Sequence, residues 1–478
     1  MQGRFLANLI LFVLVNLLVK PISLFAVDAG FQNTLGHEEY GVYFSLLNFS
    51  LLFNILLDFG INNFTTRRVA QQPEKSKKLF GTVFIFRLLL FILYLLVLVV
   101  SGLLIGYDDR AISILFLLGI NQFIILSIAY FRSHFAGFHY FRLDALLSVL
   151  DRFLLIIFGC YFLYFFEGSL HIETFVWIQF FTYFVSFLIS YILFIRYIDS
   201  PVFNINFSLS LAILKRSIPY AILIVLMLIY SRIDSVLLER LHHQGAEQAG
   251  IYAQGYRLLD AFYMFGMIFA GLLYPMFSRY LSENKAAIYP LLRSAGDLLI
   301  GSAILIAIIC VYNSSLFLSF IYEDYHEAIY PFHWLIISFI AICMNFIFGT
   351  LLTASGNLKV LNWISFLGIL LNIVLNLLLI PKYGALGAAF TTFVTQFFTA
   401  ILQCVYAIKL FQIPVQIGHW IKYPLLITVL LVLSEFLRDT TILLLTQVTI
   451  GSIGMFVLSF ISWAAIKEMI NEKANKIN

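Results

Sequence analysis

The stretch that decides the fold is residues 215–279, KRSIPYAILIVLMLIYSRIDSVLLERLHHQGAEQAGIYAQGYRLLDAFYMFGMIFAGLLYPMFSR. It contains two apolar segments joined by a short polar link. Each segment is long enough to cross a bilayer as a helix, which takes about 20 residues. The first contains Arg232 and Asp234, and the second contains Arg257 and Asp260. A charge in hydrocarbon is costly, so these side chains are predicted to face a bundle interior or a water-filled cavity.

The rest of the chain has the composition of a membrane protein. Of its 478 residues, 62% are hydrophobic and 11% are charged, whereas about a quarter of the residues in soluble proteins are charged. Apolar runs recur from Leu6 to Ile466 with short polar breaks. This pattern predicts an all-α polytopic membrane protein, because a β-barrel would show short alternating segments instead.

The apolar runs divide into fourteen predicted transmembrane helices. Their predicted bounds are 5–30, 40–64, 79–106, 111–133, 143–166, 174–198, 216–240, 249–279, 293–322, 329–353, 359–380, 384–409, 422–438 and 441–466. Most loop Lys and Arg residues fall on one side with both termini, and the other side has only Arg110, Arg240, Lys382 and Arg438. By the positive-inside rule, both termini are predicted to be cytoplasmic.

Two pairs of similar segments predict an internal repeat. Residues 38–43, EEYGVY, resemble residues 247–252, EQAGIY, while residues 174–182 share TFV and QFFT with residues 392–399. Repeats with an even number of spans have the same orientation in the membrane, and transporters place their site between such halves. The predicted domains are an N-terminal lobe of helices 1–6 (residues 1–200), a C-terminal lobe of helices 7–12 (residues 201–411), and helices 13–14 with a cytoplasmic tail (residues 412–478).

Three basic residues are predicted to lie at a similar depth in the membrane. Lys20, Arg232 and Arg257 are each roughly 8–10 residues from the outer end of their helix, which is about 12–15 Å at 1.5 Å per residue. A cavity lined by these cations would bind an anion. Arginine suits phosphate because its planar guanidinium donates two parallel hydrogen bonds. Arg87 lies closer to the basic side and is predicted at the entrance of this cavity.

The acidic residues leave alternatives open. Asp58, Asp234 and Asp260 are candidates for binding a coupling cation. Arg257 and Asp260 are also spaced i, i+3, so they can instead form a salt bridge on one helix face. In that case the prediction of an anion site loses its best support.

Motifs for catalysis and cofactor binding are absent from the sequence. It has no glycine-rich nucleotide loop, and its four cysteines lie in apolar runs without metal-ligand spacing. His242 and His243 are adjacent on a predicted turn, where their side chains point apart, which argues against a metal site. The loops on the side opposite the basic residues are too short to carry the catalytic residues of a membrane glycosyltransferase, polymerase or ligase. The chain is therefore predicted not to be an enzyme, with no metal, no cofactor and no nucleic-acid partner.

Four segments carry a family resemblance. They are residues 35–43 (LGHEEYGVY), 57–61 (LDFGI), 249–258 (AGIYAQGYRL) and 371–389 (LNIVLNLLLIPKYGALGAA). In order and spacing, the chain resembles bacterial oligosaccharide (Wzx-type) flippases. These belong to the polysaccharide transporter family, within the superfamily that also contains multidrug (MATE) exporters and the lipid II flippase.

The resemblance implies a flippase of the bacterial cytoplasmic (inner) membrane. Its substrate would be undecaprenyl-diphosphate-linked oligosaccharide, moved between leaflets by alternating access for O-antigen, capsule or exopolysaccharide synthesis. Lys20, Arg232 and Arg257 would contact the headgroup, with Arg87 next, and the last two helices would bind the lipid tail. Membrane lipid and polysaccharide polymerase or assembly proteins would be the partners. The alternatives are a lipid II flippase and a cation-coupled multidrug exporter, although the latter would favour acidic residues in its cavity.

Overall fold

A computed structural model describes residues 14–166, 170–198, 200, 202, 207–414, 416–437, 442–458 and 460 of the chain. Every regular element in this part is a helix, as the sequence predicts. Ten of the described helices are long and apolar enough to cross a membrane. The residues form two compact units. Unit 1 runs through Gln254 and adds Ile321–Asp324 and Asn376–Ala388, whereas unit 2 contains Gly255–Phe320, Tyr325–Leu375 and the described residues from Ala389 onward.

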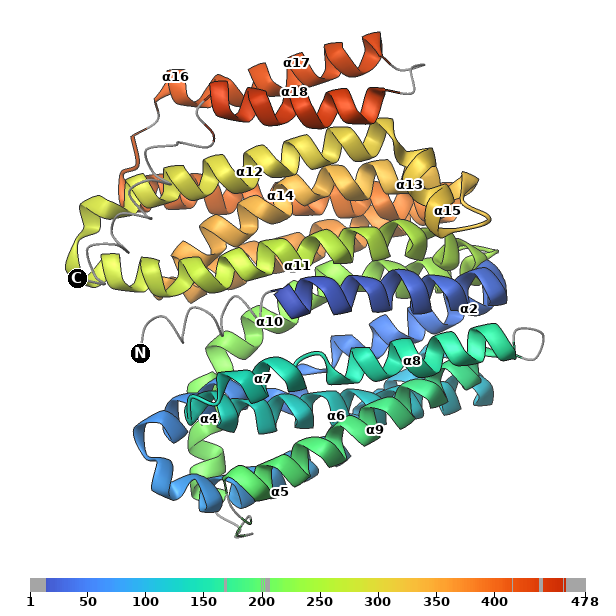
Figure 1. The fold of residues 1–478 in the computed structure, drawn as a ribbon, viewed down its shortest axis with the longest axis vertical. Coiled ribbons are helices and arrows are strands. Elements are labelled where there is room, and N and C mark those ends of the chain that lie inside the picture. Colours follow the sequence, from blue (N-terminus) through green and yellow to red (C-terminus); the bar gives the residue numbers. More distant parts are fainter. Residues whose placement is uncertain are drawn as a thin grey trace. The chain divides into compact units, whose positions relative to one another are not determined.

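Unit 1 is organised around α2 (Ala29–Leu52) and α6 (Asp109–Gly137), as Figure 1 shows. Helix α2 packs against α10 (Phe207–Leu241), and α6 packs against both α2 and α9 (Ile172–Tyr197). The other elements are helical residues 14–22, η1 (Ser23–Asp28), α3 (Ile55–Asp58), α4 (Ile61–Gln71), η2 (Pro73–Lys75), α5 (Ser76–Ile105), α7 (Phe141–Leu147), α8 (Leu150–Phe165) and the start of α11 (Gly245–Glu283).

Unit 2 is organised around α12 (Ile288–Tyr312), which packs against α14 (Ile329–Ala354). The antiparallel helices α17 (Lys422–Phe436) and α18 (Leu443–Val457) pack against each other and against α12 (Figure 1). The other elements are the rest of α11, η4 (Lys285–Ala287), α13 (Ser314–Ile321), η5 (His326–Ala328), most of α15 (Leu358–Phe411) and α16 (Ile417–Trp420).

Two glycines interrupt the longest helical stretches. Residues 14–52 form a stretch of 39 residues with a non-helical backbone at Gly36 (φ 79°, ψ 175°). Helix α15 has 54 residues and breaks at Gly384 (φ 51°, ψ −129°). A straight helix of that length would extend roughly 80 Å, far more than the hydrocarbon thickness of about 30 Å. Glycine adopts these positive φ values without a Cβ clash, and both breaks lie at or beside a predicted boundary between spans.

The predicted count of fourteen spans is not confirmed, because several predicted spans are divided or short. The predicted span 40–64 breaks where Phe59 (φ 43°) and Gly60 (φ 76°) adopt left-handed conformations. The predicted span 143–166 divides into α7 and α8 next to Ser148, whose hydroxyl donates to the carbonyl of Ala145 (2.7 Å) and so competes with regular helix bonding. Helices α17 and α18 have 15 residues each.

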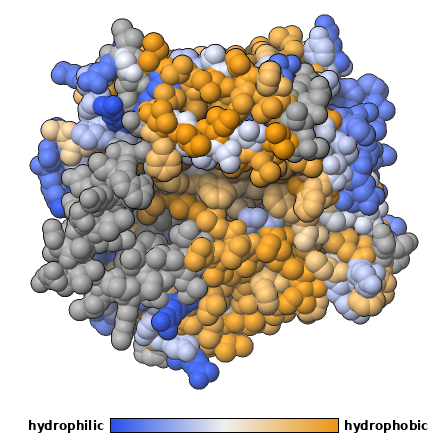
Figure 2. Space-filling view, turned by 45° about the horizontal axis from the view of Figure 1, so that its top comes forward, coloured by the Kyte–Doolittle hydropathy of each residue, from blue (hydrophilic) through white to orange (hydrophobic). Residues whose placement is uncertain are grey.

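The surface of the described part is strongly apolar. Hydrophobic side chains cover much of the face in Figure 2, and hydrophilic residues gather towards its sides. Leu104, Phe320 and Phe436 are among the most exposed, at 82%, 91% and 85%. Large exposed apolar surface is unusual in soluble proteins but normal where lipid is the solvent.

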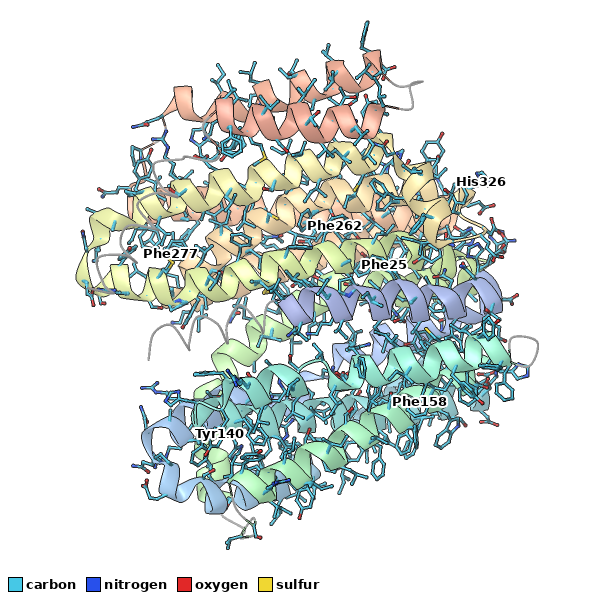
Figure 3. All side chains as sticks on the ribbon, in the orientation of Figure 1. Phe25, Tyr140, Phe158, Phe262, Phe277 and His326 are labelled. Carbon is cyan, nitrogen blue, oxygen red and sulfur yellow. The ribbon has the colours of Figure 1, made fainter. Side chains whose placement is uncertain are left out.

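Aromatic packing fills the interior of unit 1. Phe80, Phe131 and Phe194 belong to one buried cluster, and the rings of Phe80 and Phe194 lie 4.2 Å apart between centroids. Figure 3 shows Phe158 along α8 and Tyr140 just before α7. This packing fixes the helices that carry the polar residues described next.

Candidate functional site

Asp234 of α10 lies in a buried polar centre of unit 1, where only 1% of the residue is exposed. Its Oδ1 accepts a hydrogen bond from the Asn376 amide of α15 at 2.6 Å, and its Oδ2 accepts one from the Tyr252 hydroxyl of α11 at 3.4 Å. A buried carboxylate is tolerated only when its oxygens have such partners. The carboxylate of Asp234 therefore joins α10 to the next helix, α11, and to Asn376 of α15, which is 142 positions away in the sequence.

Arg232 lies two residues before Asp234 and points to a different side of α10, because successive helical residues are rotated by about 100°. Its Nη1 donates to the side-chain oxygen of Asn48 on α2 at 3.4 Å, and the residue is partly exposed. Asn48 itself is buried and donates to the carbonyl of Phe44 at 2.9 Å. Arg232 is thus held near α2 without being enclosed.

Lys20 lies in a second polar cluster of unit 1. Its ammonium is within electrostatic reach of Arg152 and Asp151 on α8 and of Arg132 on α6. Arg132 Nε pairs with the Asp144 carboxylate at 2.7 Å. Three basic side chains therefore gather in this cluster, and the nearby carboxylates are those of Asp144, Asp151 and Asp28, which is within electrostatic reach of Arg152.

Arg132 and Arg152 were not among the residues selected from the sequence. Arg152 Nε lies 3.6 Å from the Asp151 carboxylate, and its guanidinium lies 5.8 Å from the ring centre of Tyr183. The available signal was the i, i+7 spacing of Asp144 and Asp151, which would share one face of an unbroken helix but lie on α7 and α8.

Arg87 and Asp58, which were predicted in separate roles, lie side by side. Arg87 is completely buried. It donates to the Asn62 side chain at 2.9 Å and to the Leu126 carbonyl at 2.8 Å, and it pairs with Asp58 at 3.5 Å. Its guanidinium also lies 5.1 Å from the ring centre of Tyr130. These contacts join α5 to α3, α4 and α6.

Arg257 and Asp260 of unit 2 lie close enough to form the i, i+3 salt bridge that the sequence allows as an alternative to an anion site. The Arg257 Nη1 and Asp260 Oδ2 atoms are 3.9 Å apart, and both side chains are largely buried. This distance is at the outer limit of an ion pair. The role of Arg257 in an anion site, in common with Lys20 and Arg232, stays a prediction.

The helices of unit 1 close tightly at the end opposite the basic loops. A Cβ atom on Gly41 of α2 would collide with the carbonyl oxygen of Ala246, and one on Gly250 of α11 would collide with that of His37. The buried Gln32 side chain donates to the Gly250 carbonyl at 2.8 Å. Helices α2 and α11 therefore cross main chain to main chain, and the glycines at the crossing are equivalent positions of the predicted repeat.

Three polar contacts reinforce this closed end. The Gln248 side chain accepts from the backbone amide of Ala385 at 2.8 Å, next to the break at Gly384. The Gln254 amide donates to the carbonyl of Asp324 at 2.8 Å. The carboxylate of Asp324 lies 3.4 Å from the His37 ring.

An ion-pair cluster lies at the same end of unit 1. Arg110 pairs with Glu39 at 2.9 Å and with Glu173 at 2.6 Å. Nearby, the Tyr107 hydroxyl donates to the Glu239 carboxylate at 3.4 Å, and burial of this loop residue raises the pKa of its phenol. These contacts join α2, α6, α9, α10 and the loop between α5 and α6 at one end.

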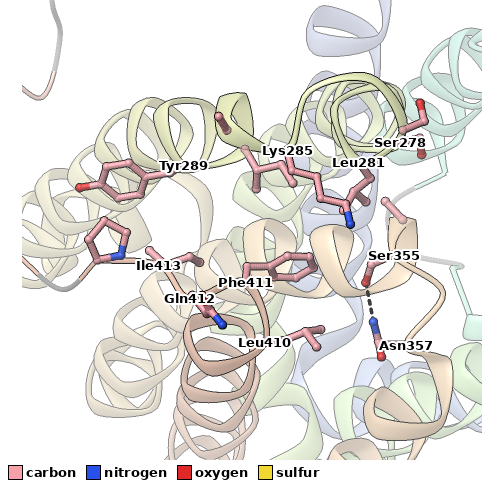
Figure 4. A pocket seen from close by; sticks show the side chains of 15 residues that line it. Ser278, Leu281, Lys285, Tyr289, Ser355, Asn357, Leu410, Phe411, Gln412 and Ile413 are labelled. Atoms are coloured by element: carbon pink, nitrogen blue, oxygen red, sulfur yellow. Dashed lines mark hydrogen bonds between the residues drawn. The ribbon is translucent and has the colours of Figure 1, made fainter.

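A pocket of about 880 Å³ with mixed polar and apolar walls opens at the basic end of unit 2 (Figure 4). Lys285 reaches into it from η4, and its other walls include the ends of α11, α14 and α15 and the start of α12. The Asn357 amide donates to the Ser355 hydroxyl at 2.8 Å in its wall. This pocket contains none of the site residues that were predicted from the sequence.

Solved structures of membrane transporters share this fold. A lipid II flippase, MurJ in an inward closed conformation, aligns with a TM-score of 0.74 at 15% identity, covering 96% of this chain and 99% of that one. An inward-facing multidrug resistance MATE family transporter of the MOP superfamily aligns with a TM-score of 0.61 at 13% identity, covering 84% and 94%. A point mutant of the MATE transporter VcmN of Vibrio cholerae aligns with a TM-score of 0.56 at 18% identity. The alignment covers 85% of this chain and 97% of that chain.

The fold is therefore that of the flippases and transporters of the MOP superfamily. A search of curated protein sequences gave no match. The model of the family described as "Polysaccharide biosynthesis protein" matches residues 5–281, more than half of the chain. The chain belongs to this family, as the sequence resemblance predicts.

Proposed function

We propose that the protein is a flippase for undecaprenyl-diphosphate-linked oligosaccharide in surface polysaccharide synthesis. The observation that carries this proposal is the gathering of three basic side chains around Lys20, with the partly exposed Arg232, inside an apolar bundle of the polysaccharide biosynthesis family. Cations at this depth need an anionic partner, and a diphosphate supplies two phosphate groups for charge-assisted hydrogen bonds.

In this proposal, the headgroup contacts Lys20, Arg232 and Arg257 while the polyprenyl tail remains in lipid. Asp234 and Asp260 are proposed to take part in ion coupling. The closed crossing of α2 and α11 supports a state that is shut on the outer side. If the outer side then opens and the basic end closes, the headgroup is released to the other leaflet. This sequence of states is alternating access.

For Arg87 and Asp58 we propose roles that differ from those predicted from the sequence. Because the Arg87 guanidinium is fully buried and bonded to Asn62 and Leu126, we assign it a positioning role for the helices in place of headgroup contact. Asp58 serves as its partner in that network.

We propose that the protein lies in the bacterial cytoplasmic membrane with both termini in the cytoplasm, together with the polymerase or assembly proteins that use its product. The distribution of basic loops supports this orientation. Reporter fusions after residues 140 and 245 should report cytoplasmic and outer locations, respectively. The reverse pattern would contradict the orientation.

The test of function is a flipping assay with the full chain in liposomes. Undecaprenyl-diphosphate-linked oligosaccharide is placed in the membrane, and a sugar-binding lectin in the external buffer reports its exposure. Exposure should increase faster with the protein than in empty liposomes. Equal rates in both preparations would reject the proposal.

Lipid II is the second candidate substrate, because the MurJ structure matches nearly the whole chain. The same liposomes loaded with lipid II in place of the oligosaccharide distinguish the two. Faster flipping of lipid II, together with rescue of cells depleted of their lipid II flippase, would favour this alternative.

A further inference from the structure

Unit 2 contains a second pocket, of about 480 Å³, at the basic end of α12 and α17. Arg293, Gln416 and Lys422 supply its polar side chains. Ile421, Leu425 and Val457 line it with apolar side chains that are 60%, 48% and 75% exposed, respectively. One wall of the pocket is therefore cationic, and the other is open to the surrounding lipid.

The cationic wall holds more positive charge than its single carboxylate balances. The Lys422 ammonium pairs with Asp297 Oδ2 at 2.6 Å, and the Tyr423 hydroxyl donates to Asp297 Oδ1 at 2.9 Å. Both oxygens of Asp297 thus have partners. Arg293 is exposed, and no carboxylate pairs with it in the described part of the chain. An anion in this pocket would interact with Arg293 directly and reduce its repulsion with Lys422.

The aromatic residues beside the pocket indicate its depth. Trp420 and Tyr423 lie next to each other, with ring centres 5.9 Å apart. Trp and Tyr concentrate where the hydrocarbon meets the headgroups, and Lys and Arg concentrate on the cytoplasmic side. The pocket is therefore at the level where phospholipid phosphates of one leaflet lie.

The α17–α18 pair that forms the apolar wall is firmly attached to α12. The Asn313 amide donates to the Gln447 side chain at 2.7 Å, and the Gln447 amide donates to the Ser434 hydroxyl at 2.7 Å; all three residues are buried. This chain of hydrogen bonds joins α12, α18 and α17 at the end away from Lys422. This end of the α17–α18 pair is thus attached to α12 independently of any ligand in the pocket.

We propose that this pocket binds an anionic phospholipid, with its phosphate between Arg293 and Lys422 and its acyl chains along Ile421, Leu425 and Val457. A free phosphate would use only the cationic wall, and a zwitterionic lipid would bring its own cation to that wall. The site is separate from Lys20, Arg232 and Arg257, so it goes beyond the proposed flipping of a lipid-linked sugar. Its bound lipid would fasten the basic end of the α17–α18 pair to α12.

The test measures lipid binding to the purified full chain in detergent by native mass spectrometry. The probes are phosphatidylglycerol, phosphatidylcholine and inorganic phosphate. Phosphatidylglycerol should be retained most strongly, and Arg293→Ala should weaken its retention about tenfold, the loss expected for one charge-assisted hydrogen bond. Lys359→Ala removes another exposed cation of unit 2 and should leave retention unchanged.

A second variant keeps the test independent of the ion pair at Asp297. Leu425→Ser changes only the apolar wall and should also weaken retention of phosphatidylglycerol, because an acyl chain loses its contact. Equal retention of phosphatidylcholine and phosphatidylglycerol would overturn the proposal. So would displacement of the lipid by inorganic phosphate at equal concentration, or an effect of Lys359→Ala as large as that of Arg293→Ala. A failure of flipping in liposomes has no bearing on these readouts.

Discussion

Gly41 of α2 and Gly250 of α11 lie at a crossing where each glycine faces the main chain of the other helix. Neither position has room for a Cβ atom, since the carbonyl oxygens of Ala246 and His37 occupy that space. Small residues allow such close helix contacts in membranes. This crossing brings two main chains into contact at the end that is proposed to face outward.

Alanine at either glycine should weaken the closed crossing. Overpacking costs about 1–3 kcal/mol, which shifts a closed-to-open equilibrium by roughly five- to hundredfold. Cysteines at His37 and Ala246, which flank the two glycine contacts, should be joined efficiently by a short bifunctional thiol reagent in the native background and poorly with Gly41→Ala. Gly271→Ala in the same α11 is the control, because no atom lies within 4 Å of its added Cβ. Unchanged crosslinking with Gly41→Ala would argue against a tight crossing.

Exchanging the residues at positions 234 and 376 should reveal whether the hydrogen bond between Asp234 and Asn376 stabilises the folded protein. Asn376→Asp alone places a second carboxylate at a 2.6 Å contact, so the thermal unfolding temperature should decrease sharply. Asp234→Asn together with Asn376→Asp restores one carboxylate and one amide, and the unfolding temperature should recover in part. If the double variant is no more stable than Asn376→Asp alone, the two side chains do not act as a pair.

Arg87→Lys should reduce the amount of folded protein. Lysine cannot reproduce the guanidinium contacts to Asn62 and Leu126, and breaking a buried charge network costs about 3–5 kcal/mol. Size-exclusion chromatography in detergent measures the folded fraction, with Arg279→Lys at an exposed ion pair as the control. Normal folding with lost glycan export would instead place Arg87 in contact with the headgroup, as the sequence alone predicts.

Lys20→Ala and Arg232→Ala should each decrease glycan export while the protein reaches the membrane at normal levels. Each removes a charged contact to the proposed diphosphate, worth about 1.5–3 kcal/mol, so the affinity should decrease by roughly ten- to hundredfold. Flipping rates in liposomes at increasing substrate concentration measure this loss. Arg279→Ala removes an exposed cation and should have no effect. Full export by the Lys20→Ala, Arg232→Ala double variant would reject the headgroup site.

The sequence predicts the fold well because membrane helices are set by local composition. The apolar runs locate the helices, and the breaks at Gly36 and Gly384 fall at or beside predicted boundaries. The interruption at Phe59 was missed, because a left-handed backbone at a phenylalanine has no local sequence signal.

The polar contacts were harder to predict, because partners come from distant segments. The i, i+3 spacing of Arg257 and Asp260 is visible in the sequence and gives a real contact. The bond between Asp234 and Asn376 joins residues 142 positions apart, which no spacing rule reveals. The repeat located Gly41 and Gly250 as equivalent positions, but it gave no reason to expect that they meet.

The glycine crossing also bears on how fast the closed end can open. At most helix contacts, side chains interdigitate and must leave their neighbours' grooves before the helices separate. Gly41 and Gly250 have no side chains to withdraw, so once the Gln32 amide releases the Gly250 carbonyl, the two main chains can part and rejoin over a smooth surface. A contact of this kind combines close approach with a low kinetic barrier, which suits an element that must open and reclose in every cycle.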